Sequence, residues 1–147
     1  KIIIQRIHNL FYNDLNEYLK LQIYNTIFML FLGLVIMLVI YFLGYFIILN
    51  ILNENYFQSI AILKVLVLCI PIHFASKIFD VSLQVSKFIK NKLYIMLFAA
   101  LLNLTLNIVF IPKYGLISAA YTTLLTELSL LSIFIFLFTK NYIKYSK

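Results

Sequence analysis

The feature that most limits how this chain can fold is the stretch from Leu21 to Leu49, which contains no charged side chain. A membrane-spanning helix needs about 20 mostly apolar residues, so this run is long enough to cross with tilt to spare. Over its 147 residues the chain is 64% hydrophobic and only 12% charged. A soluble domain of this size cannot bury such an excess, because much of its surface stays outside. The sequence therefore predicts an integral membrane protein.

Three further apolar runs follow the first one, separated by short polar connections. The predicted fold is all-α, with four transmembrane helices in a region covering 21–139. The spans are expected at about 21–49, 57–85, 93–111 and 116–138. A segment 1–20 precedes them and a basic tail 140–147 follows. Because the chain begins with Lys1 and shows no signal peptide, we expect it to be a piece of a longer protein.

The positive charges alternate from one connection to the next. Segments 1–20, 86–92 and 140–147 together carry nine Lys and Arg residues, whereas the connections 50–56 and 112–115 carry only Lys113. Lys and Arg accumulate on the cytoplasmic side of membrane proteins. This bias predicts a multi-pass protein of the cell (inner, cytoplasmic) membrane with both ends of the segment in the cytoplasm.

Segment 1–20 has its own pattern of apolar residues at helical spacing. These residues are Ile4, Ile7, Phe11, Leu15 and Tyr18. The spacing predicts an amphipathic helix that either lies in the membrane interface or packs on another part of a larger protein.

Several classes of site are disfavoured by the composition. Cys69 is the single cysteine, so neither a disulfide framework nor a cysteine metal cluster is available, and we expect no metal and no cofactor. The formal net charge of +7 comes mainly from the ends of the apolar runs and forms no basic face with interleaved aromatics. Nucleic acid is therefore not an expected partner, whereas membrane lipids are.

The second span contains the largest group of polar residues in a costly environment. His73, Lys77 and Asp80, with Gln84 beyond them, follow a spacing that places them on one helix face. They are candidates for lining a substrate cavity, as is Lys64. Lys77 and Asp80 are three residues apart and can pair. The bland alternative is that Lys77 snorkels to the surface with Asp80 as its counter-ion.

A proline also lies in this span. Pro71 cannot donate a backbone hydrogen bond and its ring crowds the carbonyl of Val67, which predicts a kink near the middle of the span.

The third and fourth spans carry helix-packing signals and one acid. Asn103 and Asn107 share a face and are expected to bond a neighbouring helix, and Ser118, Ala119 and Ala120 belong to a small-residue surface suited to close packing. Pro112 is expected to end the third helix and Gly115 to permit a tight turn. Glu127 lies near the middle of the fourth span with no obvious partner in the chain, so it is a cavity candidate, with a structural hydrogen bond as the alternative.

The run from Asn103 to Glu127, NLTLNIVFIPKYGLISAAYTTLLTE, resembles a segment of polysaccharide biosynthesis proteins. These are O-antigen-type flippases of lipid-linked oligosaccharides, in the multidrug/oligosaccharidyl-lipid/polysaccharide exporter superfamily. The stretch NENYFQSIAILKVL is also similar to the family's pattern, and the resemblance covers about residues 40–130. The chain departs from the family in having Ser118 for the usual Gly, Thr122 for the usual Ala, and no Gly in the 86–92 turn.

The resemblance implies a role for the chain. It would be the last third of a transporter with about twelve helices in two lobes, and the missing amino-terminal lobe would be its partner. The complete protein would move an undecaprenyl-pyrophosphate-linked oligosaccharide across the membrane by alternating access, for surface polysaccharide biosynthesis.

Other functions remain open at the level of the sequence. A cation-coupled small-molecule antiporter of the same superfamily is the first alternative. A membrane-embedded glycosyltransferase or polymerase of the same pathway is disfavoured, because Asp14, Glu17 and Glu54 form no acidic cluster outside the spans. We therefore expect that the protein is not an enzyme. A free-standing four-helix protein that only packs with partners is the third alternative.

Overall fold

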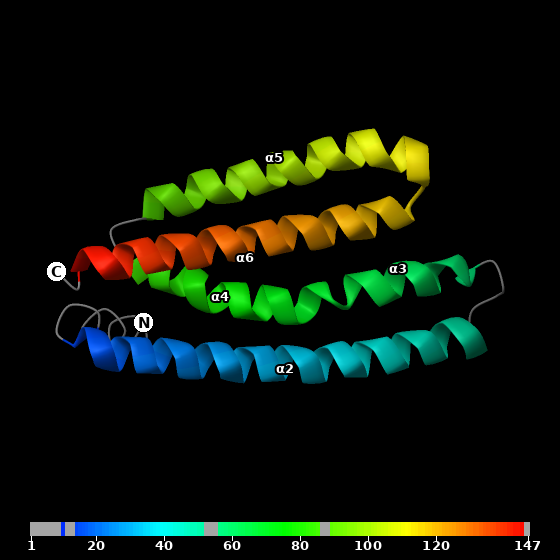
Figure 1. Cartoon of the computed structure of the whole chain (residues 1–147). Helices are drawn as coiled ribbons and strands as arrows, with labels where there is room; N and C mark the ends of the chain where they lie inside the picture. The colour runs from blue at the N-terminus through cyan, green and yellow to red at the C-terminus, as the bar shows by residue number, and fades with distance from the viewer. Residues whose placement is uncertain (1–9, 11–13, 52–55, 86–88, 146–147) are drawn as a thin grey trace.

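The computed structural model describes the chain except for residues 1–9, 11–13, 52–55, 86–88 and 146–147. The described residues form helices and no strand. With the labels of Figure 1, the helices are α2 (Leu15–Asn50), α3 (Gln58–Leu66), α4 (Cys69–Val85), α5 (Ile89–Tyr114) and α6 (Ile117–Tyr145). Four stretches are long and apolar enough to cross a membrane: Asn16–Asn50, Gln58–Leu83, Lys92–Tyr114 and Ile117–Lys140. The chain is thus an all-α, multi-pass membrane protein by the length and composition of its helices.

The first span begins earlier than the sequence predicts. Asp14 is the N-cap of α2, and its Oδ1 accepts a hydrogen bond of 3.0 Å from the backbone N–H of Glu17. Such a cap satisfies an otherwise unpaired donor of the first turn. The last residues of segment 1–20 are therefore continuous with the first span, and the predicted boundary at 20/21 is wrong. The rest of the predicted amphipathic helix lies almost entirely outside the described residues.

The second span is broken into two helices, where the sequence predicts a kink. The break falls at Val67 and Leu68, and the N–H groups of Leu68 and Ile70 donate to carbonyls only three residues back. Pro71 follows within a turn of the break and has no N–H to donate to the carbonyl of Val67. The irregularity lies close to the proline at which the sequence predicts a kink, and it divides the span into α3 and α4.

The helices form an open row. In Figure 1 the spatial order is α2, then α3 and α4, then α6, then α5, so that α2 and α5 occupy the two edges. The strongest packing is of α2 on α4, of α6 on α4, and of α5 on α6, whereas α4 meets α5 over a smaller area. Because α6 contacts α5 on one side and α4 on another, a crevice forms in the angle between the three helices.

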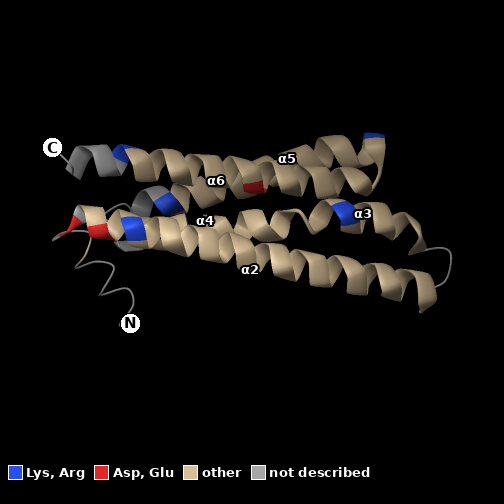
Figure 2. Ribbon diagram, turned by 60° about the horizontal axis from the view of Figure 1, so that its bottom comes forward, with Lys and Arg blue, Asp and Glu red and all other residues tan. Residues whose placement is uncertain are grey.

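The two ends of the row differ. Helix α2 begins and α6 finishes at the same end, named here the terminal end, and the α5–α6 connection lies at the opposite turn end (Figure 1). Figure 2 shows charged positions of the described residues mainly near the two ends, with one basic position in α3 and one acidic position within α6. The tail from Lys140 to Tyr145 continues α6.

The α5–α6 turn is made by Gly115, not by Pro112. Pro112 lies inside the last turn of α5, which runs on to Tyr114, so the prediction that it ends the helix is wrong. Gly115 follows with φ of +73° and its N–H donates 2.9 Å to the carbonyl of Ile111. A glycine in the left-handed region is the usual terminator of a helix.

We expect Gly115→Ala to destabilise the chain by about 1 kcal/mol, because a Cβ is strained at positive φ. Nothing lies within 4 Å of the added Cβ, so the strain is conformational and no clash contributes. Gly115→Asn should cost less, since asparagine tolerates this conformation. Unfolding in mixed detergent micelles, followed by circular dichroism, measures both. Equal costs for the two variants would contradict the left-handed turn.

Candidate functional site

The centre of the crevice is a contact between α4 and α6. His73 Nδ1 lies 3.3 Å from Glu127 Oε2, across 54 positions of sequence. The prediction that Glu127 has no obvious partner in the chain is therefore wrong. The His73 side chain is 49% exposed and that of Glu127 is 21% exposed. Both residues belong to stretches that can span the membrane. The exposed part of each side chain is not covered by any described residue of the chain.

Two further candidates lie one and two turns towards the terminal end on the same face of α4. Lys77 and Asp80 line a small crevice of about 60 Å³ together with His73 and Glu127. The spacing of these residues predicts a shared face, and the structure brings the three α4 side chains to one crevice. The side chain of Gln84 lies outside the description.

The ion pair on Asp80 is not the one that sequence spacing suggests. Lys92 Nζ, at the start of α5, lies 2.8 Å from Asp80 Oδ1, and both side chains are largely buried. Asp80 is thereby tied to the next helix. Lys77 itself is exposed. A pair between the beginning of α5 and the end of α4 also fixes the two helices across the 86–88 connection.

The crevice continues into a polar groove between α5 and α6. This groove has a volume of about 410 Å³ and shares Met96, Glu127 and Leu130 with the crevice. Its wall includes Asn103 on α5 and Thr123 on α6. Glu127 thus lies where the crevice and the groove meet. Polar groups at this depth usually face a protein interior or a watery cavity.

A chain of hydrogen bonds joins α5 to α6 at the wall of the groove. Asn103 Nδ2 donates to Thr126 Oγ1 (3.2 Å), Asn107 Nδ2 donates to Asn103 Oδ1 (2.8 Å), and Thr122 Oγ1 donates to Asn107 Oδ1 (2.6 Å). The two asparagines therefore bond the neighbouring helix, as their shared face indicates. They position α6, and with it Glu127.

The small residues of α6 lie on more than one face. Ser118 and Ala120 are buried, and Ala119 is half-buried. Their size allows α6 to lie close to its neighbours. Lys64 is placed elsewhere: it is exposed on α3, beyond the helix break, and lines neither the crevice nor the groove.

Two polar contacts escaped the reading of the sequence. Lys92 reads as a loop charge at the edge of a span, and nothing in its local pattern points to Asp80. Ser82 Oγ donates 2.8 Å to Gln22 Oε1 and ties α4 to α2. Gln22 is buried, although it falls in the first uncharged run. The sequence shows that Gln22 and Ser82 are polar residues within apolar helices. That they pair with each other follows only from the packing of α2 against α4.

Among the described residues that line the crevice, one cationic side chain forms no ion pair with an acid. Asp80 is neutralised by Lys92, and Glu127 faces His73. Among the described residues that line the crevice, Lys77 is the charged group without an ion pair of 4 Å or less to an acid. The crevice can therefore attract an anion through Lys77. No group of three or more His, Cys, Asp or Glu suited to a metal ion occurs within the described ranges.

Comparison with known proteins adds no further constraint. No protein-family model, no curated protein and no solved structure matches the chain. The functional argument therefore rests on the residues and their geometry.

Proposed function

We propose that the chain is the carboxyl-terminal part of a membrane transporter that moves a lipid-linked oligosaccharide across the cytoplasmic membrane. The observation that carries this proposal is Lys77, a cation left over in a crevice between membrane-spanning helices. A pyrophosphate-linked lipid offers an anionic group at the junction of its sugar and its hydrocarbon chain. A lysine in the crevice is placed to attract that group as it passes the apolar part of the membrane.

Two other features support transport over a purely structural role. The second span is discontinuous next to the crevice, and broken helices are common where transporters bind substrate and change conformation. The crevice and groove also hold hydrogen-bonding side chains at a depth where lipid offers none. Together with the resemblance of the Asn103–Glu127 segment, these features favour a flippase of lipid-linked sugars, with the other lobe of the transporter supplying the rest of its cavity.

One observation favours a second candidate function. Glu127, with a histidine at 3.3 Å, is an acid in a membrane span. Such a group suits a cation-coupled antiporter of small molecules. The two candidates differ in the residue on which they depend: Lys77 for an anionic lipid, Glu127 for a coupled cation. An enzyme is the weakest proposal, because Asp14, Glu17 and Glu54 form no acidic cluster in the sequence.

We expect Lys77→Ala to abolish most of the flippase activity. Losing a charge-assisted contact to a phosphate weakens binding by about ten- to a hundredfold. The test is complementation, by the gene with its flanking coding sequence, of a strain that lacks its own flippase, with surface polysaccharide as the readout and membrane levels checked by blotting. Lys77→Arg should retain part of the activity.

Lys64→Ala is the matched control for this experiment. Like Lys77→Ala, it removes an exposed lysine from the second span, but this lysine lies in the other half of the span and outside the crevice. It should leave polysaccharide levels near those of the unmodified gene. Equal loss in both variants would show that charge in the span, and not the crevice, matters. Failure of the well-inserted unmodified protein to complement would overturn the flippase proposal.

A further inference from the structure

A second groove lies on the other side of the α5–α6 contact, near the turn end. It has a volume of about 520 Å³, and its lining is predominantly apolar. Two residues of α5 and three of α6 form its walls, and two small, buried residues of α6 form its floor. The wall residues are Phe110, Tyr114, Ile117, Tyr121 and Leu125, and the floor residues are Ser118 and Thr122.

The floor of this groove offers little to a polar ligand. Ser118 Oγ donates 2.6 Å to the carbonyl of Gly115, and Thr122 Oγ1 donates 2.6 Å to Asn107 Oδ1. Both hydroxyl hydrogens are thus committed within the protein. Tyr121 and Leu125 are more than half exposed, so the groove is open along its outer side. At membrane depth, an open groove of this lining accepts hydrocarbon.

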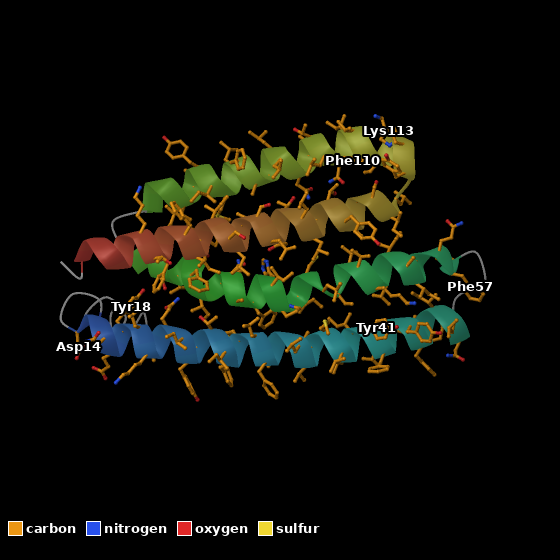
Figure 3. The ribbon with its side chains drawn as sticks, in the orientation of Figure 1. Asp14, Tyr18, Tyr41, Phe57, Phe110 and Lys113 are labelled. Atoms are coloured by element: carbon orange, nitrogen blue, oxygen red, sulfur yellow. The ribbon has the colours of Figure 1, made fainter. Side chains whose placement is uncertain are left out.

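A lysine directly precedes Tyr114, a residue of the groove, and is exposed at the turn end of α5. Lys113 lies three residues after Phe110, and residues three and four apart are neighbours on a helix surface. The rings of Phe110 and Tyr114 have centroids 5.9 Å apart, so this face of α5 is packed together. Figure 3 labels Phe110 and Lys113 at the turn end of α5. The described acids Asp14, Glu17, Asp80 and Glu127 all lie elsewhere in the chain, outside this end of the hairpin.

We propose that this groove is a binding site for an anionic phospholipid of the leaflet at the turn end, with one acyl chain between the rings of α5 and α6 and the phosphate at Lys113. The apolar lining accounts for the acyl chain. Lys113, which forms no ion pair with a described acid, accounts for the charge of the headgroup. This site is separate from the crevice at Lys77 and does not depend on the proposed transport function.

The absence of tryptophan from the sequence makes a direct test possible, because a single introduced tryptophan is the only indole reporter. Tyr121→Trp places the reporter in the groove wall. Phe46→Trp is the matched control: it lies on the open face of α2, four residues from the turn end of its helix, as Tyr121 is from the start of α6. Their exposed fractions are 59% for Phe46 and 57% for Tyr121.

The full chain is reconstituted in phosphatidylcholine vesicles that contain a fixed fraction of brominated phosphatidylglycerol or brominated phosphatidylcholine. Quenching of each tryptophan gives the relative affinity of its site for the two lipids. We expect phosphatidylglycerol to be favoured about fivefold at position 121, from the stabilisation typical of one lysine near an anionic lipid. The ratio at position 46 should be about one.

Two lysine variants distinguish an effect of Lys113 from an effect of the total positive charge of the chain. Lys113→Gln should lower the ratio at position 121 to about one, whereas Lys64→Gln, which removes another exposed lysine of the turn-end half, should leave it unchanged. Equal ratios at positions 46 and 121, or no effect of Lys113→Gln, would overturn the proposal. So would the absence of quenching at position 121, which would mean that protein covers the groove. Stronger protection by unbrominated polyprenyl phosphate than by phosphatidylglycerol would assign the groove to a different lipid and overturn it as well.

Discussion

Replacing Gly33 by alanine should destabilise the bundle by about 1–3 kcal/mol, the usual cost of inserting a methyl group into a packed interface. A Cβ at this position would lie 2.7 Å from the Cα of Pro71 and 3.3 Å from the Cβ of Phe74. The nearest of these atoms belongs to the backbone of α4, which cannot rotate away. Helix α2 would have to withdraw from α4, which is the most extensive contact that α2 makes.

Gly44→Ala is the control, since it is the same change in the same helix. The added Cβ would lie 2.9 Å from Leu63 Cδ2, which is the tip of a flexible side chain. Rotation of Leu63 relieves the contact, so we expect a change within about 0.5 kcal/mol. The free energy of unfolding in mixed micelles, followed by circular dichroism, measures both variants. A larger loss for Gly44→Ala than for Gly33→Ala would show that α2 does not lie against Pro71.

The pair Gly33 and Pro71 also shows what the sequence could predict. Pro71 indicates an irregular second span, because its missing N–H is a local property. Gly33 is readable only as a residue tolerated in a membrane helix. Gly33 leaves room for the α4 backbone at Pro71, which is 38 positions away in sequence. This role depends on how α2 and α4 are placed relative to each other. Local chemistry thus located the break, whereas the contact that packs against it required the structure.

The same division holds for the candidate site. The spacing of His73, Lys77 and Asp80 predicts a shared face, because it follows from the period of one helix. Their partners do not follow from a period. Glu127 reaches His73, and Asp80 pairs with Lys92, through the packing of α6 and α5 against α4. The nearest charge in sequence is therefore a poor guide to the partner of a charge in the membrane.

Removing His73 should cost more stability when Glu127 is a carboxylate than when it is an amide. His73→Ala leaves the carboxylate without its 3.3 Å partner, whereas glutamine at 127 keeps the shape without the charge. The coupling energy should be about 1 kcal/mol, as is common for polar contacts between membrane helices.

The measurement is a double-mutant cycle of unfolding free energies for His73→Ala and Glu127→Gln, with the same variants scored for complementation. An equal cost of His73→Ala in both backgrounds would mean that the two side chains do not interact. The complementation result then distinguishes the roles of the acid. If Glu127→Gln is stable and still supports surface polysaccharide, its role is the hydrogen bond to α4, because the amide can supply that bond. If Glu127→Gln is stable and inactive, the negative charge itself is required, and the cation-coupled transporter becomes the favoured function of the crevice.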